Sequence, residues 1–303
     1  MATGKQIILS REIALLLLLA LLWGGSYTLI KLAVADIPPI TLIAVRVTLA
    51  AIFLLTVLRW QNERLPAGAA NWGRLLVQSF FNSIGAWTVL AWGQQYVESS
   101  LASVLNSTSP LFVFFLTLLV TRHESAGPVK FLGAFLGFAG VVLIIGTQAL
   151  TGLGQQLAGQ LATLAGAFLY ALAAIYGRHF SHLSPTATAA GTMICAAFVL
   201  VPASVVLDRP FDISPSATAI FAALGLSVFC TGVALLIYFR LIRTLGSLGV
   251  ASQAYLRAGV GVLLGIFILG EKLTPALLLG LLAALIGVAL MNWPASGHRN
   301  SDR

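Results

Sequence analysis

Residues 247–275 read SLGVASQAYLRAGVGVLLGIFILGEKLTP, an apolar stretch of helix length with one arginine near its middle. This run predicts a transmembrane helix over about residues 245–269, so that Arg257 lies about twelve residues from either end. At about 1.5 Å per residue, its Cα is roughly 18 Å from each membrane interface, which is too deep for the side chain to snorkel. Gln253 and Gly261 share its helical face. We therefore expect this face to point into the bundle.

The same stretch has a counterpart 147 residues earlier, where residues 100–128 read SLASVLNSTSPLFVFFLTLLVTRHESAGP. The offset pairs Gln253 with Asn106 and Pro275 with Pro128, and it continues without a gap on both sides. A fixed offset of this length indicates an internal duplication.

The composition defines the class of protein. Hydrophobic residues make up 59% of the chain and charged residues 9%, with a mean hydropathy of +0.97, which is too apolar for a soluble globule. The net charge of +8 comes from basic residues spread singly and in pairs between apolar runs, a pattern typical of membrane orientation signals and not of nucleic-acid binding. Cys195 and Cys230 fall inside apolar runs, where small core residues are expected and not a disulfide or a metal site. No metal or cofactor is expected.

Ten apolar segments predict an all-α membrane protein with ten transmembrane helices arranged as two inverted five-helix repeats. The helices are expected at about residues 13–34, 39–58, 75–95, 100–121, 129–146, 161–177, 185–206, 217–239, 245–269 and 275–293. The corresponding division is a cytoplasmic head at 1–12, a first repeat at 13–147, an uncharged linker at 148–160, a second repeat at 161–293 and a cytoplasmic tail at 294–303.

The charges of the connections predict the orientation. Twelve Lys and Arg residues lie in the head, the even-numbered connections and the tail, and three lie on the other side. This asymmetry places both termini in the cytoplasm. Because each repeat has an odd number of helices, the second must be inverted relative to the first, as in secondary transporters with a substrate site near the midplane.

Polar and aromatic side chains recur on particular helical faces and predict a central cavity. Pro110 is expected to bend its helix and free carbonyl groups toward that cavity. The candidate substrate-binding residues are Trp23, Tyr27, Asn82, Ser83, Trp87, Ser103, Asn106, Tyr170, Tyr238, Gln253 and Arg257.

Each candidate has a structural alternative. Arg257 could be bonded to backbone carbonyls of the bundle, and the aromatic residues could serve packing or an interfacial belt. Arg46 is expected nearer the outer interface, where it would snorkel or tie loops together. Glu124 and Glu271, at helix junctions, are interpreted as loop caps. No Asp or Glu is expected deep in any span, so a carboxylate proton relay is not predicted.

Two motifs resemble a known family. The sequences WGGSYTLIKLA at 23–33 and PPITLIAVRVTLAAIFLL at 38–55, with the paired Glu and Gly positions that end each repeat, resemble the ten-helix EamA-type proteins of the drug/metabolite transporter superfamily. The aromatic-rich first half is most similar to the bacterial aromatic amino acid exporters. The resemblance implies a bacterial inner-membrane protein whose central cavity opens alternately to each side. The chain departs from the family at 255–258, where YLRA replaces a YLEP-like segment and reverses the charge at Arg257.

The sequence thus favours export of small amphipathic metabolites, amino acids including aromatic ones among them, by a monomer or weak homodimer in the lipid bilayer. An anionic group of the substrate would face Arg257. Exchange of sugar phosphates or nucleotide sugars, which would require more cationic residues in the cavity, and export of drugs or cationic compounds are alternatives. An intramembrane enzyme is a third class. It would need a nucleophile with a base or clustered metal ligands, whereas all four His fall in loops, helix ends or the tail.

Overall fold

The computed structural model describes residues 2–121, 128–149, 154–238, 240–241, 244 and 253–291. The elements in this part of the chain are all helical. They are α1 (Ala2–Ala33), α2 (Pro39–Trp60), α3 (Ala69–Ser79), the π-helical segment η1 (Phe80–Gly85), α4 (Ala86–Tyr96), α5 (Ser99–Asn106), α6 (Ser109–Thr121), α7 (Pro128–Ala149), α8 (Gly154–Tyr176), the 3₁₀ segment η2 (Gly177–Phe180), α9 (Pro185–Leu207), α10 (Ala217–Ser227), the π-helical segment η3 (Val228–Val233), α12 (Gln253–Leu269) and α13 (Pro275–Met291).

The helices have the length and composition of membrane spans. Seven described helical stretches are long and apolar enough to cross a membrane, and three further apolar helices at Pro128–Ile144, Leu256–Leu269 and Pro275–Met291 are shorter. The prediction of an all-helical membrane protein is confirmed. The count of ten spans and the inversion of the repeats stay predictions.

The predicted bend near Pro110 is confirmed as a break between α5 and α6 at residues 107–108. Proline has no N–H to donate to the carbonyl four residues earlier, so the helix cannot continue unchanged through this point. Side chains take part in the turn instead. The Ser107 hydroxyl donates to the Ser103 carbonyl at 2.7 Å, and the Thr108 hydroxyl donates to the Leu105 carbonyl at 2.6 Å.

Two helices contain a π-helical segment at nearly matching places in the two halves. Segment η1 joins α3 to α4, and η3 follows α10; they begin at Phe80 and Val228. These starts lie 148 residues apart, one more than the offset of the sequence duplication. A π-helical turn inserts one residue and is frequent at functional sites. The sequence pattern did not predict either segment.

Two predicted boundaries differ from the structure. Residues 2–12 of the predicted head belong to α1, and α8 begins at Gly154 inside the predicted linker. The linker residues from 154 onward pack closely against α4: a Cβ at Gly159 would lie 2.8 Å from the Gly93 carbonyl oxygen. This close contact joins α8 to α4 across small residues.

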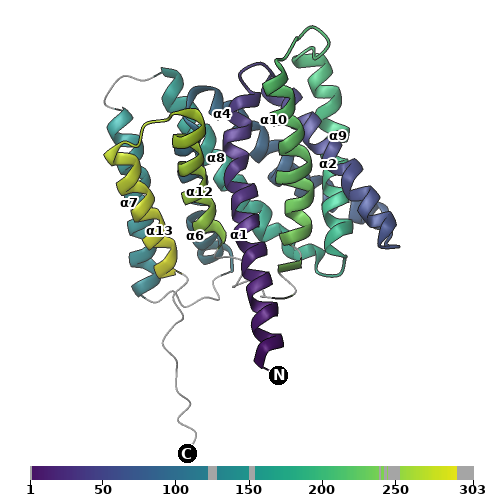
Figure 1. The fold of residues 1–303 in the computed structure, drawn as a ribbon, viewed down its shortest axis with the longest axis horizontal. Coiled ribbons are helices and arrows are strands. Elements are labelled where there is room, and N and C mark those ends of the chain that lie inside the picture. Colours follow the sequence, from purple (N-terminus) through teal and green to yellow (C-terminus); the bar gives the residue numbers. More distant parts are fainter. Residues whose placement is uncertain are drawn as a thin grey trace, which may run out of the picture.

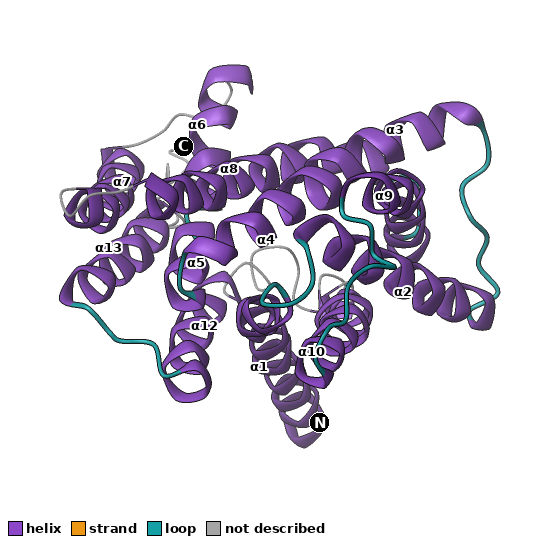
Figure 2. Ribbon diagram, turned by 90° about the horizontal axis from the view of Figure 1, so that it is seen from above, coloured by secondary structure: helices purple, strands orange, loops and turns teal. Residues whose placement is uncertain are grey.

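Helices from the two halves pair side by side. Helix α7 packs along α13, α2 along α9, α1 along α12 and α4 along α8 (Figures 1 and 2). The predicted small-residue seam on α7 is confirmed, since a Cβ at Gly133 would lie 2.5 Å from the Gly287 carbonyl oxygen of α13. The first turn of α1 and the end of α13 lie at the same end of the bundle (Figure 1). Cys195 and Cys230 are buried and free, as predicted.

Candidate functional site

A cationic side chain from α2 lies inside the bundle. Arg46 is only 5% exposed, and its Cζ lies 3.7 Å from the centre of the Trp87 ring on α4. Its Nε donates to the hydroxyl of Thr231 in η3 at 2.9 Å. The interpretation of Arg46 as a snorkelling residue is wrong, because the helix packing surrounds its guanidinium group with α4 and η3. A cation within a span must face protein or water, and this rule predicts a buried position for Arg46 as it does for Arg257.

Aromatic side chains connect Arg46 to the opposite half of the chain. The Trp87 Nε1 donates a short hydrogen bond to the hydroxyl of Tyr170 on α8. The charges of Arg46 and Arg257 also act on this hydroxyl through space, as does the Tyr27 hydroxyl, although no hydrogen bond joins any of them to it in the described part. Three predicted site residues, Tyr27, Trp87 and Tyr170, therefore lie in one group with both arginines. We call this group, together with Thr231, the central cluster.

Two amides at equivalent positions of the duplication carry unpaired oxygen atoms. Asn106 is 1% exposed and donates from Nδ2 to the Tyr27 hydroxyl at 2.6 Å, and Gln253, the first residue of α12, is 8% exposed. The Asn106 Oδ1 and Gln253 Oε1 atoms are buried and accept no hydrogen bond from the described residues. Because both side chains are buried, neither faces lipid, as the duplication argument requires.

Arg257 lies on α12 and is partly exposed, with a buried Nε that has no partner among the described residues. Its backbone packs tightly against α1, where a Cβ at Gly24 would lie 2.8 Å from the Arg257 carbonyl oxygen. The predicted depth of Arg257 depends on residues 245–252, which lie outside the described part of the chain. Ser103 is fully buried beside this helix, with its hydroxyl 3.5 Å from the Ala258 carbonyl.

The remaining predicted residues form separate pairs. Trp23 packs against Tyr238 in a tilted arrangement with ring centres 5.2 Å apart, beside a small apolar group that contains Leu19 and Leu241. Asn82 donates to Ser83 at 3.1 Å within η1, and Ser83 is fully buried.

Two carboxylates hold helix ends together. Glu12, which was predicted to lie in the head, belongs to the apolar part of α1 at Ser10–Ala33 and is 3% exposed. Its carboxylate accepts hydrogen bonds from Arg240 at 2.8 Å and from Thr244 at 2.9 Å. Glu271 accepts from the backbone N–H groups of Ser99 and Ser100 at 2.6 and 2.8 Å. The prediction that Glu271 is a cap is confirmed. Its counterpart Glu124 lies outside the described residues.

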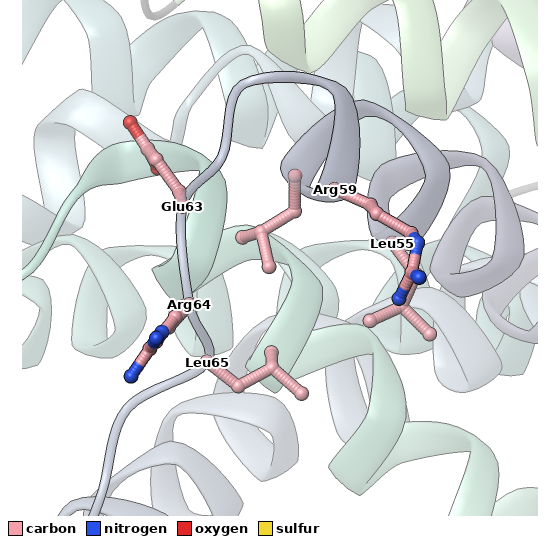
Figure 3. A pocket seen from close by; sticks show the side chains of 6 residues that line it. Leu55, Arg59, Glu63, Arg64 and Leu65 are labelled. Atoms are coloured by element: carbon pink, nitrogen blue, oxygen red, sulfur yellow. The ribbon is translucent and has the colours of Figure 1, made fainter.

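A hollow of about 330 Å³ opens at the end of α2, lined by Leu55, Leu58, Arg59, Glu63, Arg64 and Leu65 (Figure 3). None of the predicted site residues lines it. Within the described residues, no three His, Cys, Asp or Glu side chains are grouped so as to hold a metal ion. The central cluster is therefore the better candidate for a binding site.

Long apolar helices around an interior with buried cations, amides and aromatic rings define a multi-pass membrane protein with a polar centre. The chain belongs to the EamA-like transporter family, whose sequence pattern matches residues 10–146 and again residues 157–293. The two matches begin and end 147 residues apart, which is the offset found in the sequence. The resemblance to the drug/metabolite transporter superfamily is confirmed, and the protein is a transporter of this class.

Several known sequences and a solved structure are similar to this chain over nearly its full length. It is 28% identical to the uncharacterized inner membrane transporter YedA of Escherichia coli K12, over 90% of this chain and 88% of YedA. It is 24% identical to the uncharacterized transporter YoaV of Bacillus subtilis, over 92% of this chain and 96% of YoaV. One solved crystal structure superposes with a TM-score of 0.64 at 18% identity, covering 93% of this chain and 97% of that one, which shows the shared fold.

Proposed function

We propose that the protein is a secondary transporter of the bacterial inner membrane that exports small amphipathic metabolites, including aromatic amino acids. The observation that carries this proposal is the buried Nε of Arg257, which has no hydrogen-bond partner in the described part. The charge of Arg257 also acts through space on the Tyr170 hydroxyl. A guanidinium in this state can bind a substrate carboxylate through two parallel hydrogen bonds.

The other functional groups of an amino acid have partners nearby. The unpaired amide oxygens of Asn106 and Gln253 are acceptors for an amino group. The rings of Trp87, Tyr170 and Tyr27 offer an apolar surface for the side chain of the substrate. The central cluster as described contains two guanidinium groups and no carboxylate, which favours anionic or zwitterionic compounds over organic cations.

Alternating access would follow from the duplication. The offset relates α1 to α8 and α12 to α6, and the packing follows it: α1 contacts α12, and α8 contacts α6. This pairing is what a two-fold axis in the membrane plane would produce, so that rocking of one repeat against the other opens the site to each side in turn. The charge asymmetry of the connections supports cytoplasmic termini in this arrangement.

The test is transport by purified protein in liposomes. Arg257→Ala should abolish uptake of labelled phenylalanine into preloaded liposomes while the melting temperature stays near that of the wild type. Arg257→Lys should recover little, because a point charge does not reproduce the planar guanidinium. Arg64→Ala, at an exposed arginine outside the central cluster, is the matched control and should transport normally. Full transport by Arg257→Ala would remove this residue from the site, and a sharp loss of stability would assign it a structural role.

A further inference from the structure

We propose that Arg46 is a second anion-binding residue of the transport site, so that a second negative charge on a substrate strengthens its binding. This inference rests on the proposed function and names the charge class of its substrates. The contacts that hold the guanidinium group of Arg46 carry it.

Two contacts orient the guanidinium group of Arg46, and its two terminal nitrogens make no hydrogen bond to the described residues. The Trp87 ring covers one face of the guanidinium group, and Thr231 accepts from Nε. No described residue accepts a hydrogen bond from Nη1 or Nη2, and these atoms are not fully occluded, unlike Nε of Arg257. This terminal pair of nitrogens is the edge of arginine that binds carboxylate or phosphate with two hydrogen bonds. The anchored side chain presents this edge without having to reorder.

No carboxylate acts on Arg46 from the described part of the chain. The groups that do are the ring of Trp87 and the hydroxyl of Thr231, which contact it, and the Tyr27 and Tyr170 hydroxyls and the Cys230 thiol, which act through space. All of these groups are neutral at pH 7 at their ordinary pKa values. A cation that is buried inside a membrane bundle normally pairs with an anion or lines an aqueous pathway. A bound anionic substrate would provide the missing counter-charge.

Two cations approach the same hydroxyl group from different halves of the chain. Arg46 on α2 lies in the first matched segment, and Arg257 on α12 lies in the second, while both interact with Tyr170. Each carries a positive charge, and a substrate with two negative charges would compensate both. The shared chemistry is therefore a second negative charge, carried either by another carboxylate or by a phosphate group.

A purely structural role makes a different prediction. If Arg46 only joined α4 to η3, it would use its contact with the Trp87 ring and its hydrogen bond from Nε to Thr231. Its loss would then weaken the binding of every ligand alike. As an anion-binding residue, it discriminates between ligands by charge. Three compounds with the same phenyl group separate these roles: 3-phenylpropionate with one negative charge, and phenylsuccinate and phenyl phosphate with two at pH 7.4.

The experiment measures calorimetric binding of these compounds to the purified full-length protein in detergent. The wild type should bind phenylsuccinate or phenyl phosphate about tenfold more tightly than 3-phenylpropionate, the effect of one additional charged hydrogen-bonded pair. Arg46→Gln should remove this preference, with a loss of affinity about tenfold larger for the doubly charged compounds than for 3-phenylpropionate. Arg64→Gln should leave the affinities for all three compounds unchanged. Whichever doubly charged compound binds more tightly identifies the source of the second charge.

Two results would overturn the assignment of Arg46. One is equal affinity of the wild type for singly and doubly charged compounds, and the other is an equal loss for all three in Arg46→Gln. Arg46→Lys provides the same comparison if Arg46→Gln does not fold, and it should retain part of the preference because it keeps the charge. Uptake of phenylalanine and 3-phenylpropionate by wild-type liposomes tests the proposed function separately. If neither is transported, the proposed function fails, whereas loss of the charge preference alone leaves it standing.

Discussion

Gly287→Ala should push apart α7 and α13, whose backbones are in close contact at this glycine. A Cβ at this position would lie 2.5 Å from the Gly133 carbonyl oxygen and 2.7 Å from the Gly137 backbone nitrogen. Because ordinary carbon–oxygen contacts are about 3.3 Å or longer, α7 and α13 must move apart by roughly 0.8 Å at this point. The obstructing atoms are backbone atoms, which cannot rotate away as a side chain can.

The magnitude follows from two opposing terms. Overpacking of a closely packed interface costs about 1–3 kcal/mol, whereas alanine is favoured over glycine in a helix by up to about 1 kcal/mol. The net destabilisation is therefore about 1–2 kcal/mol, which should lower the melting temperature in detergent by several degrees. Gly133→Ala should have a similar effect, and the double variant should lose less than the sum, since both methyl groups fill the same contact.

Gly259→Ala on α12 is the matched control, because nothing lies within 4 Å of a Cβ built there. It should leave the melting temperature unchanged or raise it slightly through helix propensity alone. A melting temperature of Gly287→Ala equal to or above that of Gly259→Ala would refute the packing argument.

Three other predictions concern the connections between helices. Glu271→Gln should lower the melting temperature by an amount that corresponds to about 1–2 kcal/mol, because a charged acceptor for the first two N–H groups of α5 is lost; an unchanged value would contradict this. Burial and the neighbouring Glu271 raise the pKa of Glu98 above its ordinary value of 4.5, so the folded state binds the proton more tightly and loses stability as the pH rises through that raised pKa. Glu98→Gln should therefore melt above the wild type at pH 7 but not at pH 4, and a gain of equal size at both would exclude the electrostatic cause. With the two native cysteines replaced, a cysteine at Gly152 should react with an impermeant reagent in intact cells and one at Asn62 should not; the reverse pattern would invert the proposed topology.

The sequence alone determined the features that depend on local physical chemistry. Long apolar runs define membrane helices because each must satisfy its own backbone hydrogen bonds in lipid. Pro110 breaks its helix because the missing N–H acts within one turn. The offset of 147 residues is a property of the letters themselves, and the two family matches reproduce it. The small residues of α7 also identified their seam, since only residues without bulky side chains allow such close approach.

The tertiary structure decided which polar groups meet. Arg46 and Thr231 are 185 positions apart, and Glu12 and Arg240 are 228 apart, so no local pattern connects either pair. Their partners are set by which helices pack together and by how each helix is rotated. The π-helical segments contribute to that rotation, since each inserts one residue and turns the side chains that follow it. The sequence could therefore identify Arg257 as an isolated cation within a span, while the place of Arg46 beside Trp87 and Tyr170 depended on the packing of three helices around it.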